Sequence, residues 1–189
     1  MEGRPLDDQE LISRSRNGDT HAFEQLVRLH QGIALRVAYL VVRDAHEAED
    51  VTQDAFVKAY RSLTRFRVGA PFRPWLLRIV RNEALNRIRS QKRRDRLAVR
   101  AASDWVLGDA APSPETAVIT RDQHIRLLAA VDELPDRYQA VVSYRYLLEL
   151  SEKETAEILR IPRGTVKSRT ARALDRLRAV LENPAEEPT

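Results

Sequence analysis

Three carboxylates at helical spacing are the first residues that could carry chemistry. Glu47, Asp50 and Asp54 occupy positions i, i+3 and i+7 of the segment HEAEDVTQD, so a helix would place them on one face. Such a set could bind a divalent metal ion as in a nuclease, dock on a basic partner, or simply face solvent. No histidine, lysine or further acid at a matching spacing completes a catalytic set. Docking on a basic partner is therefore the interpretation that we favour.

A second predicted helix carries a polar stripe of a different kind. Within residues 75–94, the helical period brings together Arg78, Asn82, Asn86 and Arg89. Amide and guanidinium groups beside an aromatic ring are typical of surfaces that bind bases outside the duplex stack. For the ring itself, Trp75, we favour packing in the core. The basic run QKRR that follows is typical of contacts with phosphates that do not depend on sequence.

A pair of short helices near the C-terminus is the third candidate. The segment SEKE, Ser151 to Glu154, is a capping box that begins one helix, and the turn IPRG ends it. A second helix is predicted from Thr165, with apolar residues on one arc and basic residues on the other. This pattern is typical of a helix-turn-helix that enters the major groove of DNA. An ordinary helical hairpin with a solvated basic face is the alternative.

The distribution of charge supports contact with a polyanion. The net charge of the 189 residues is only +4, but residues 61–100 hold 13 Lys and Arg against 2 Asp and Glu, a net charge of +11. Residues 160–178 hold 7 against 1, a net charge of +6. Residues 1–60 are acidic, with 7 against 11, and so are residues 101–118, with 0 against 3. Two basic blocks separated by an acidic stretch favour two nucleic-acid contacts made by two bodies. Helices with solvated basic faces are the alternative.

The elements that position these groups are predicted to be helices throughout. Apolar periodicity and capping residues predict helices over 7–17, from Thr20, from Asp44, and over 75–94, 117–133 and 136–148, followed by the C-terminal pair. The segment 102–115, rich in Pro, Gly and small residues, reads as a linker. The predicted fold class is all-α, with two small helical domains joined by a flexible acidic linker. Their predicted bounds are 1–98 for the first domain, 99–118 for the linker, 119–183 for the second domain and 184–189 for a tail.

Composition excludes several classes of function. The chain has no cysteine, which excludes disulfides, thiolate zinc sites, iron–sulfur clusters and a cysteine nucleophile. The N-terminal MEGRPLDDQE has no apolar signal stretch, and the longest nearly apolar run, residues 33–42, is half the length of a membrane span. We therefore expect a cytoplasmic protein that does not insert into a membrane, with no cofactor, no bound metal and no small-molecule substrate.

In order along the chain, these motifs resemble those of bacterial sigma factors of the extracytoplasmic-function (ECF) group. The segments AFEQLVRLHQ, EAEDVTQDAFVKAYRSLTRF and FRPWLLRIVRNEALNRIRSQKRR are similar to sigma region 2. The segments LPDRYQAVVSYRY, LSEKETAEIL and IPRGTVKSRTARALDRLR are similar to region 4. Three positions depart from the usual pattern: Glu149 and Arg160 replace frequent glycines, and Ala171 stands where a bulkier side chain is common.

The resemblance implies a transcription initiation factor that has no catalysis of its own and works with core RNA polymerase, promoter DNA and an anti-sigma factor. Docking on the β′ coiled coil of the polymerase is implied for Glu47, Asp50, Gln53 and Asp54, and the β flap of the polymerase is implied as a further contact. Binding of the −10 element as a single strand, with Asn82 at a pocket for a flipped base, is implied for Arg78, Asn82, Asn86, Arg89, Lys92 and Arg93. Binding of the −35 element as a duplex is implied for Arg163, Thr165, Lys167, Ser168, Arg169 and Arg172.

Two other hypotheses remain open from the sequence. A free-standing helix-turn-helix regulator would use the C-terminal half of the chain and would leave the acidic face and the acidic linker without a function. A metal-dependent nuclease would use Glu47, Asp50 and Asp54, and would cleave nucleic acid only with magnesium.

Overall fold

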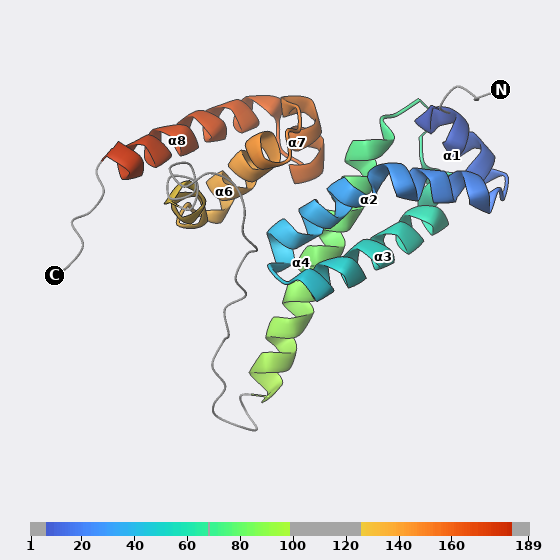
Figure 1. Cartoon of the computed structure of the whole chain (residues 1–189), viewed down its shortest axis with the longest axis horizontal. Helices are drawn as coiled ribbons and strands as arrows, with labels where there is room; N and C mark the ends of the chain where they lie inside the picture. Colours follow the sequence, from blue (N-terminus) through green and yellow to red (C-terminus); the bar gives the residue numbers. More distant parts are fainter. Residues whose placement is uncertain (1–6, 68, 99–125, 183–189) are drawn as a thin grey trace, which may run out of the picture. The chain divides into compact units, whose positions relative to one another are not determined.

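All the elements of the described chain are helical. The computed structural model describes residues 7–67, 69–98 and 126–182, and these ranges form two compact units (Figure 1). The all-α fold class with two small helical domains is thereby confirmed. The linker predicted over 99–118 and the tail predicted over 184–189 lie outside the described residues.

Three long helices form the body of the N-terminal unit. Its elements are α1 (Asp8–Arg16), α2 (Thr20–Val42), α3 (Ala45–Ser62), the 3-10 turn η1 (Leu63–Arg65) and α4 (Phe72–Ala98). Helices α2, α3 and α4 each pack against the other two, and α1 packs on α2. Their apolar stripes meet in one core, whose fully buried side chains include Leu26, Val37, Val51, Leu76, Leu77 and Val80.

Aspartates begin both α2 and α3. The Asp44 carboxylate accepts a hydrogen bond from the backbone N–H of Glu47 at 2.8 Å, as its position in the sequence predicts. For α2 the predicted cap, Thr20, is wrong by one residue, because the Asp19 carboxylate accepts from the backbone N–H of Ala22 at 3.0 Å. That hydrogen bond, together with the guanidinium of Arg14, lowers the pKa of Asp19. A carboxylate is favoured here because it also complements the positive end of the helix dipole.

A glycine and a glutamine shape the loop that leads into α4. Gly69 has a φ of +78°, a conformation that side chains with a Cβ rarely adopt. The Gln9 side chain of α1 donates to the Ala70 carbonyl at 2.9 Å and accepts from the Gly69 N–H at 3.2 Å. The first helix thus holds the loop in place.

An aromatic cluster anchors the start of α4. The Trp75 ring centroid lies 4.8 Å from that of Phe66 and 5.5 Å from that of Phe72. Phe66 and Phe72 are buried, and Trp75 is half-buried. Packing of Trp75 against the core is therefore what the structure shows.

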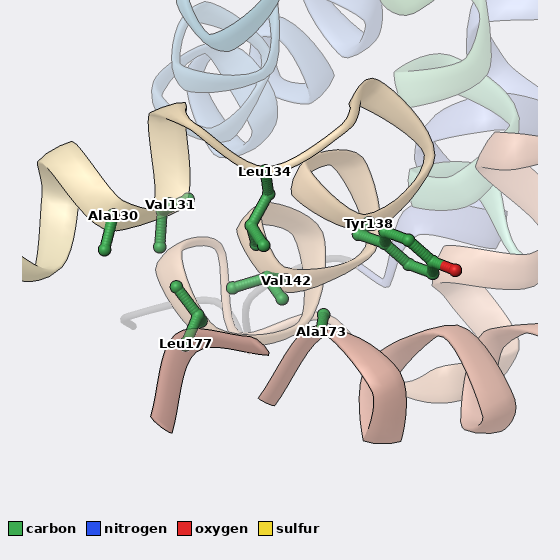
Figure 2. Packing of buried hydrophobic residues seen from close by; sticks show 7 residues of the cluster. All are labelled: Ala130, Val131, Leu134, Tyr138, Val142, Ala173 and Leu177. Atoms are coloured by element: carbon green, nitrogen blue, oxygen red, sulfur yellow. The ribbon is translucent and has the colours of Figure 1, made fainter. Parts of the chain in front are cut away.

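The C-terminal unit packs a helical hairpin against a long last helix. Its elements are a helical segment over residues 126–132, α6 (Asp136–Val142), the π-helical turn η2 (Ser143–Leu147), α7 (Glu152–Leu159) and α8 (Arg163–Glu182). The helix predicted over 136–148 is thus α6 followed by the wider π turn. Figure 2 shows the side chains that join the segment 126–134, α6 and α8: Ala130, Val131, Leu134, Tyr138, Val142, Ala173 and Leu177.

The two positions that lack the usual glycine both adopt left-handed backbone conformations. Glu149 has a φ of 53° before α7, and Arg160 has a φ of 56° at its end. At the end of α7, the Ile161 N–H donates to the Ala156 carbonyl at 3.1 Å and the Arg160 N–H donates to the same carbonyl, a helix ending that favours glycine at the left-handed position. Because each residue carries a Cβ, its left-handed conformation costs free energy that a glycine would not pay.

Glycine at either position is expected to stabilise the C-terminal unit. Glu149→Gly and Arg160→Gly should each raise its free energy of unfolding by about 0.5–1 kcal/mol, since relief of left-handed strain exceeds the entropy that glycine adds to the unfolded chain. Hydrogen exchange of α7 and α8 should slow by about two- to fivefold. Arg43→Gly, at the left-handed end of α2, is the matched control and should slow exchange only in the N-terminal unit. Unchanged or faster exchange in α7 and α8 would contradict this account.

Candidate functional site

The acidic residues of α3 share one face, as their spacing predicts. Asp50, Gln53 and Asp54 are exposed and Glu47 is half-buried, whereas the opposite side of the helix, at Val51 and Ala55 among others, is buried in the core. We call Glu47, Asp50, Gln53 and Asp54 the α3 acidic face.

Part of this face is already paired within the unit. The Arg87 guanidinium of α4 donates through Nε to the Glu47 carboxylate, and through its terminal nitrogen to the Asp50 carboxylate at 2.8 Å. These contacts raise the pKa of Arg87, chiefly through the hydrogen bond with Glu47 and further through the charges of Asp50 and Asp54. The role of Arg87 could not be predicted from the sequence, because its ion pairs with Glu47 and Asp50 form only when α3 and α4 pack together.

The stripe predicted on α4 faces solvent. Asn82, Asn86 and Arg89 are exposed and Arg78 is half-buried. The opposite side of α4 is fully buried at Leu76, Leu77, Val80 and Ala84. Lys92 and Arg93 are exposed one turn further along. The structure therefore brings the six predicted −10 residues to the surface of one helix.

Helices α7 and α8 form the predicted pair. The capping box is confirmed: the backbone N–H of Glu154 donates to Ser151 Oγ at 3.2 Å, and the Ser151 N–H donates to the Glu154 carboxylate at 2.9 Å. Helix α8 begins at Arg163, two residues before the predicted start at Thr165. Val166 and Ala173 are fully buried on one side of it.

The other side of α8 carries the predicted −35 residues. Arg163, Lys167, Ser168 and Arg172 are exposed, and Thr165 and Arg169 are half-buried. The Glu152 carboxylate of α7 lies 3.8 Å from the Arg163 guanidinium and 4.0 Å from the Lys167 ammonium. These exposed, long pairs are weak, so they leave both cations available to an anionic partner.

Tyr138 of α6 links this basic surface to the core. The residue is only 5% exposed, and two guanidinium carbons, of Arg137 and Arg176, lie 4.9 and 5.1 Å from its ring centroid. Hydrogen bonding to Arg137, and less strongly to Arg172, lowers the pKa of the Tyr138 hydroxyl. Sequence reasoning missed this cluster, since it joins residues more than thirty positions apart.

Within residues 7–67, 69–98 and 126–182, no group of three or more His, Asp or Glu side chains is placed to hold a metal ion. In the same part of the chain, no helix combines the length and the apolarity needed to cross a membrane.

Comparison with known proteins identifies the class of protein. The family model for Sigma-70 region 2 matches residues 26–94, and that for Sigma-70, region 4 matches residues 124–177. The first match contains the α3 acidic face and the whole α4 stripe, and the second contains α6, α7 and most of α8. The chain is a factor of the sigma-70 family.

Curated relatives specify the group within that family. The ECF RNA polymerase sigma factor SigW of Bacillus subtilis is 33% identical over 179 residues, which cover 91% of this chain and 95% of the relative. The ECF RNA polymerase sigma-E factor of Escherichia coli is 36% identical over 177 residues, covering 89% and 91%. The chain belongs to the ECF sigma factors, as its motifs predict, and this favours an initiation factor over a free-standing regulator.

Two solved structures share the fold. CnrH in complex with the cytosolic domain of CnrY has a TM-score of 0.67 at 24% identity, covering 93% of this chain and 97% of that one. RpoE of Bartonella quintana in complex with the anti-sigma factor NepR has a TM-score of 0.66 at 24% identity, covering 85% and 96%.

The contacts of Tyr138 with Arg137, Arg172 and Arg176, which we call the Tyr138 cluster, can be tested directly in solution. Arg137→Met is expected to raise the pKa of Tyr138 toward its usual value, because a neighbouring cation stabilises the phenolate. Arg172→Met should raise it by a smaller amount. Titration of the tyrosine Cζ resonances by NMR measures both shifts. Arg145→Met is the control, since that guanidinium lies over the Tyr146 ring instead. A Tyr138 pKa unaffected by Arg137→Met would show that the cluster does not form in solution.

Proposed function

We propose that this chain binds core RNA polymerase and directs it to specific promoters, with no catalytic activity of its own and in the cytoplasm. The observation that carries the proposal is the placement of an acidic face on α3 and an exposed Arg/Asn stripe on α4 within one packed unit of an ECF sigma factor. The basic helix α8 supplies a second surface for DNA.

Docking on the polymerase is assigned to the α3 acidic face. Asp50, Gln53 and Asp54 are exposed on α3, and the other side of this helix is buried in the core and so holds it rigidly. Carboxylates presented in this way attract a basic partner and steer its approach. We assign the β′ coiled coil to this face, and the β flap is a further polymerase contact that we propose for the chain.

Recognition of the −10 element is assigned to the α4 stripe. Asn82 and Asn86 offer amide donors and acceptors for the edges of unstacked bases, and the exposed cations Arg89, Lys92 and Arg93 can contact phosphates. Flipping a base from the stack costs a few kcal/mol, which these phosphate contacts help to offset.

Recognition of the −35 element is assigned to α8. Its N-terminal half presents exposed Lys167, Ser168 and Arg172, while Val166 and Ala173 fix the helix to the unit. Arginine can pair with both acceptors of guanine in the major groove. We assign the surrounding Arg163, Thr165 and Arg169 to contacts with the DNA backbone. An anti-sigma factor that covers these exposed surfaces is the further partner that we propose.

The proposal is tested by transcription with purified components. Core polymerase with this chain should initiate at a defined set of promoters when the 5′ ends of transcripts are mapped on genomic DNA. Core polymerase alone should give no such set. Tight binding of the chain alone to duplex DNA, with no effect on initiation, would instead support a free-standing regulator.

Asn82→Ala is expected to weaken opening of the −10 element and leave binding to core polymerase unchanged, because Asn82 is exposed and lies on α4, not on the α3 acidic face. Permanganate reactivity of unpaired thymines measures opening. Gln91→Ala, an exposed change on the same helix outside the stripe, is the control. Equal loss of opening and core binding would identify Asn82 as a packing residue.

Arg172→Ala is expected to reduce discrimination between −35 sequences by about 1–3 kcal/mol, the value of one good base contact. This discrimination is measured by binding core polymerase, loaded with the chain, to a library of promoters that differ in the −35 element. Arg178→Ala, near the C-terminal end of the same helix, should leave selectivity unchanged. A uniform loss across all sequences would make Arg172 a phosphate contact.

A further inference from the structure

We propose that Arg87 competes with the polymerase for the α3 acidic face and thereby sets the affinity of docking. The inference rests on the proposed function of that face. Its basis is that the two carboxylates at the N-terminal end of the face, Glu47 and Asp50, are held by a single arginine of the neighbouring helix.

The geometry places Arg87 where a basic partner would bind. Its Nε faces Glu47 and its terminal nitrogen lies 2.8 Å from an Asp50 oxygen, so one guanidinium spans both carboxylates. The Glu47 and Asp50 side chains are 35% and 63% exposed, and that of Arg87 is 29% exposed. The pairs thus lie at the surface, where an incoming cation can reach the same oxygens.

The contact of α3 with α4 has other sources of stability. Small and apolar side chains that are fully or almost fully buried line the core of this unit, among them Ala48, Val51, Ala55, Val80 and Ala84. A second ion pair, Lys58 with Glu83, also joins the two helices at 2.5 Å. Surface ion pairs contribute about 0–1 kcal/mol to stability. The fold therefore does not depend on Arg87. The effect of Arg87 on docking is electrostatic.

Charge determines the direction of the effect. Glu47, Asp50 and Asp54 carry three negative charges, and Arg87 offsets one of them. A basic partner meets a weaker field than the carboxylates alone would produce, and it must displace Arg87 to reach two of them. Removal of the guanidinium should therefore tighten docking, whereas loss of a residue that merely supports the face would weaken it.

The test is titration of core RNA polymerase with the full-length chain and its Arg87→Met variant, followed by fluorescence anisotropy. Methionine keeps an apolar stem of similar length and removes the charge. Binding should become about two- to fivefold tighter, and the difference should shrink at high salt. Arg28→Met is the matched control: it removes one charge and an ion pair with Glu24 on the outer side of α2, and should bind as the wild type does.

Arg87→Lys provides a second, milder variant. It keeps the charge but loses the planar fork that spans two carboxylates, so its affinity should fall between those of the wild type and Arg87→Met. Circular dichroism establishes that each variant is folded. If Arg87→Met does not fold, Arg87→Lys alone decides the question, and binding no tighter than that of the wild type overturns the inference.

The outcomes separate the inference from the function on which it rests. A wild-type chain that does not bind core polymerase overturns the proposed docking itself. A wild-type chain that binds, with an Arg87→Met variant that binds equally or more weakly, overturns only the competition by Arg87.

Discussion

The burial of one side of α4 against α2 and α3 is the interaction on which the N-terminal unit depends. Leu76, Leu77, Val80 and Ala84 are fully buried in this contact. Full burial of a leucine or valine side chain contributes about 1.5–3 kcal/mol, far more than any surface ion pair in the unit. Because this packing fixes the rotation of α4 about its axis, the α4 stripe must face solvent and Arg87 must face α3. The two proposed surfaces thus follow from one apolar contact.

In the C-terminal unit, an apolar contact between α6 and α8 positions the basic surface. Ala173 and Leu177 of α8 pack against Tyr138 and Val142 of α6 (Figure 2). This packing leaves the basic side of α8 exposed. Tyr138 contributes its ring to this core, and the guanidiniums of Arg137 and Arg176 lie over that ring. Core packing and arrangement of the basic surface are therefore coupled through one aromatic residue.

Much of this arrangement could be predicted from the sequence, because helical periodicity assigns residues to faces without tertiary information. The exposure of Asp50, Asn82 and Lys167 follows from the helical period of the apolar residues around them. The pairing of Arg87 with Glu47 could not be predicted, since it depends on the register between two helices forty residues apart. The π turn after α6 and the left-handed conformations of Glu149 and Arg160 could not be predicted from the sequence either. The sequence showed only that Glu149 and Arg160 stand where the family usually has glycine. Roles of individual residues in DNA binding rest on the family resemblance and stay predictions.

The central claim is that an acidic face on a rigid helix connects this ECF sigma factor to the polymerase. The most direct measurement is titration of bacterial core RNA polymerase with the full-length chain and with an Asp50→Arg/Asp54→Arg variant, followed by fluorescence anisotropy. The account predicts tight binding by the wild type and none by the variant, because the exposed carboxylates would become cations facing a basic partner. Equal binding by both chains would contradict it.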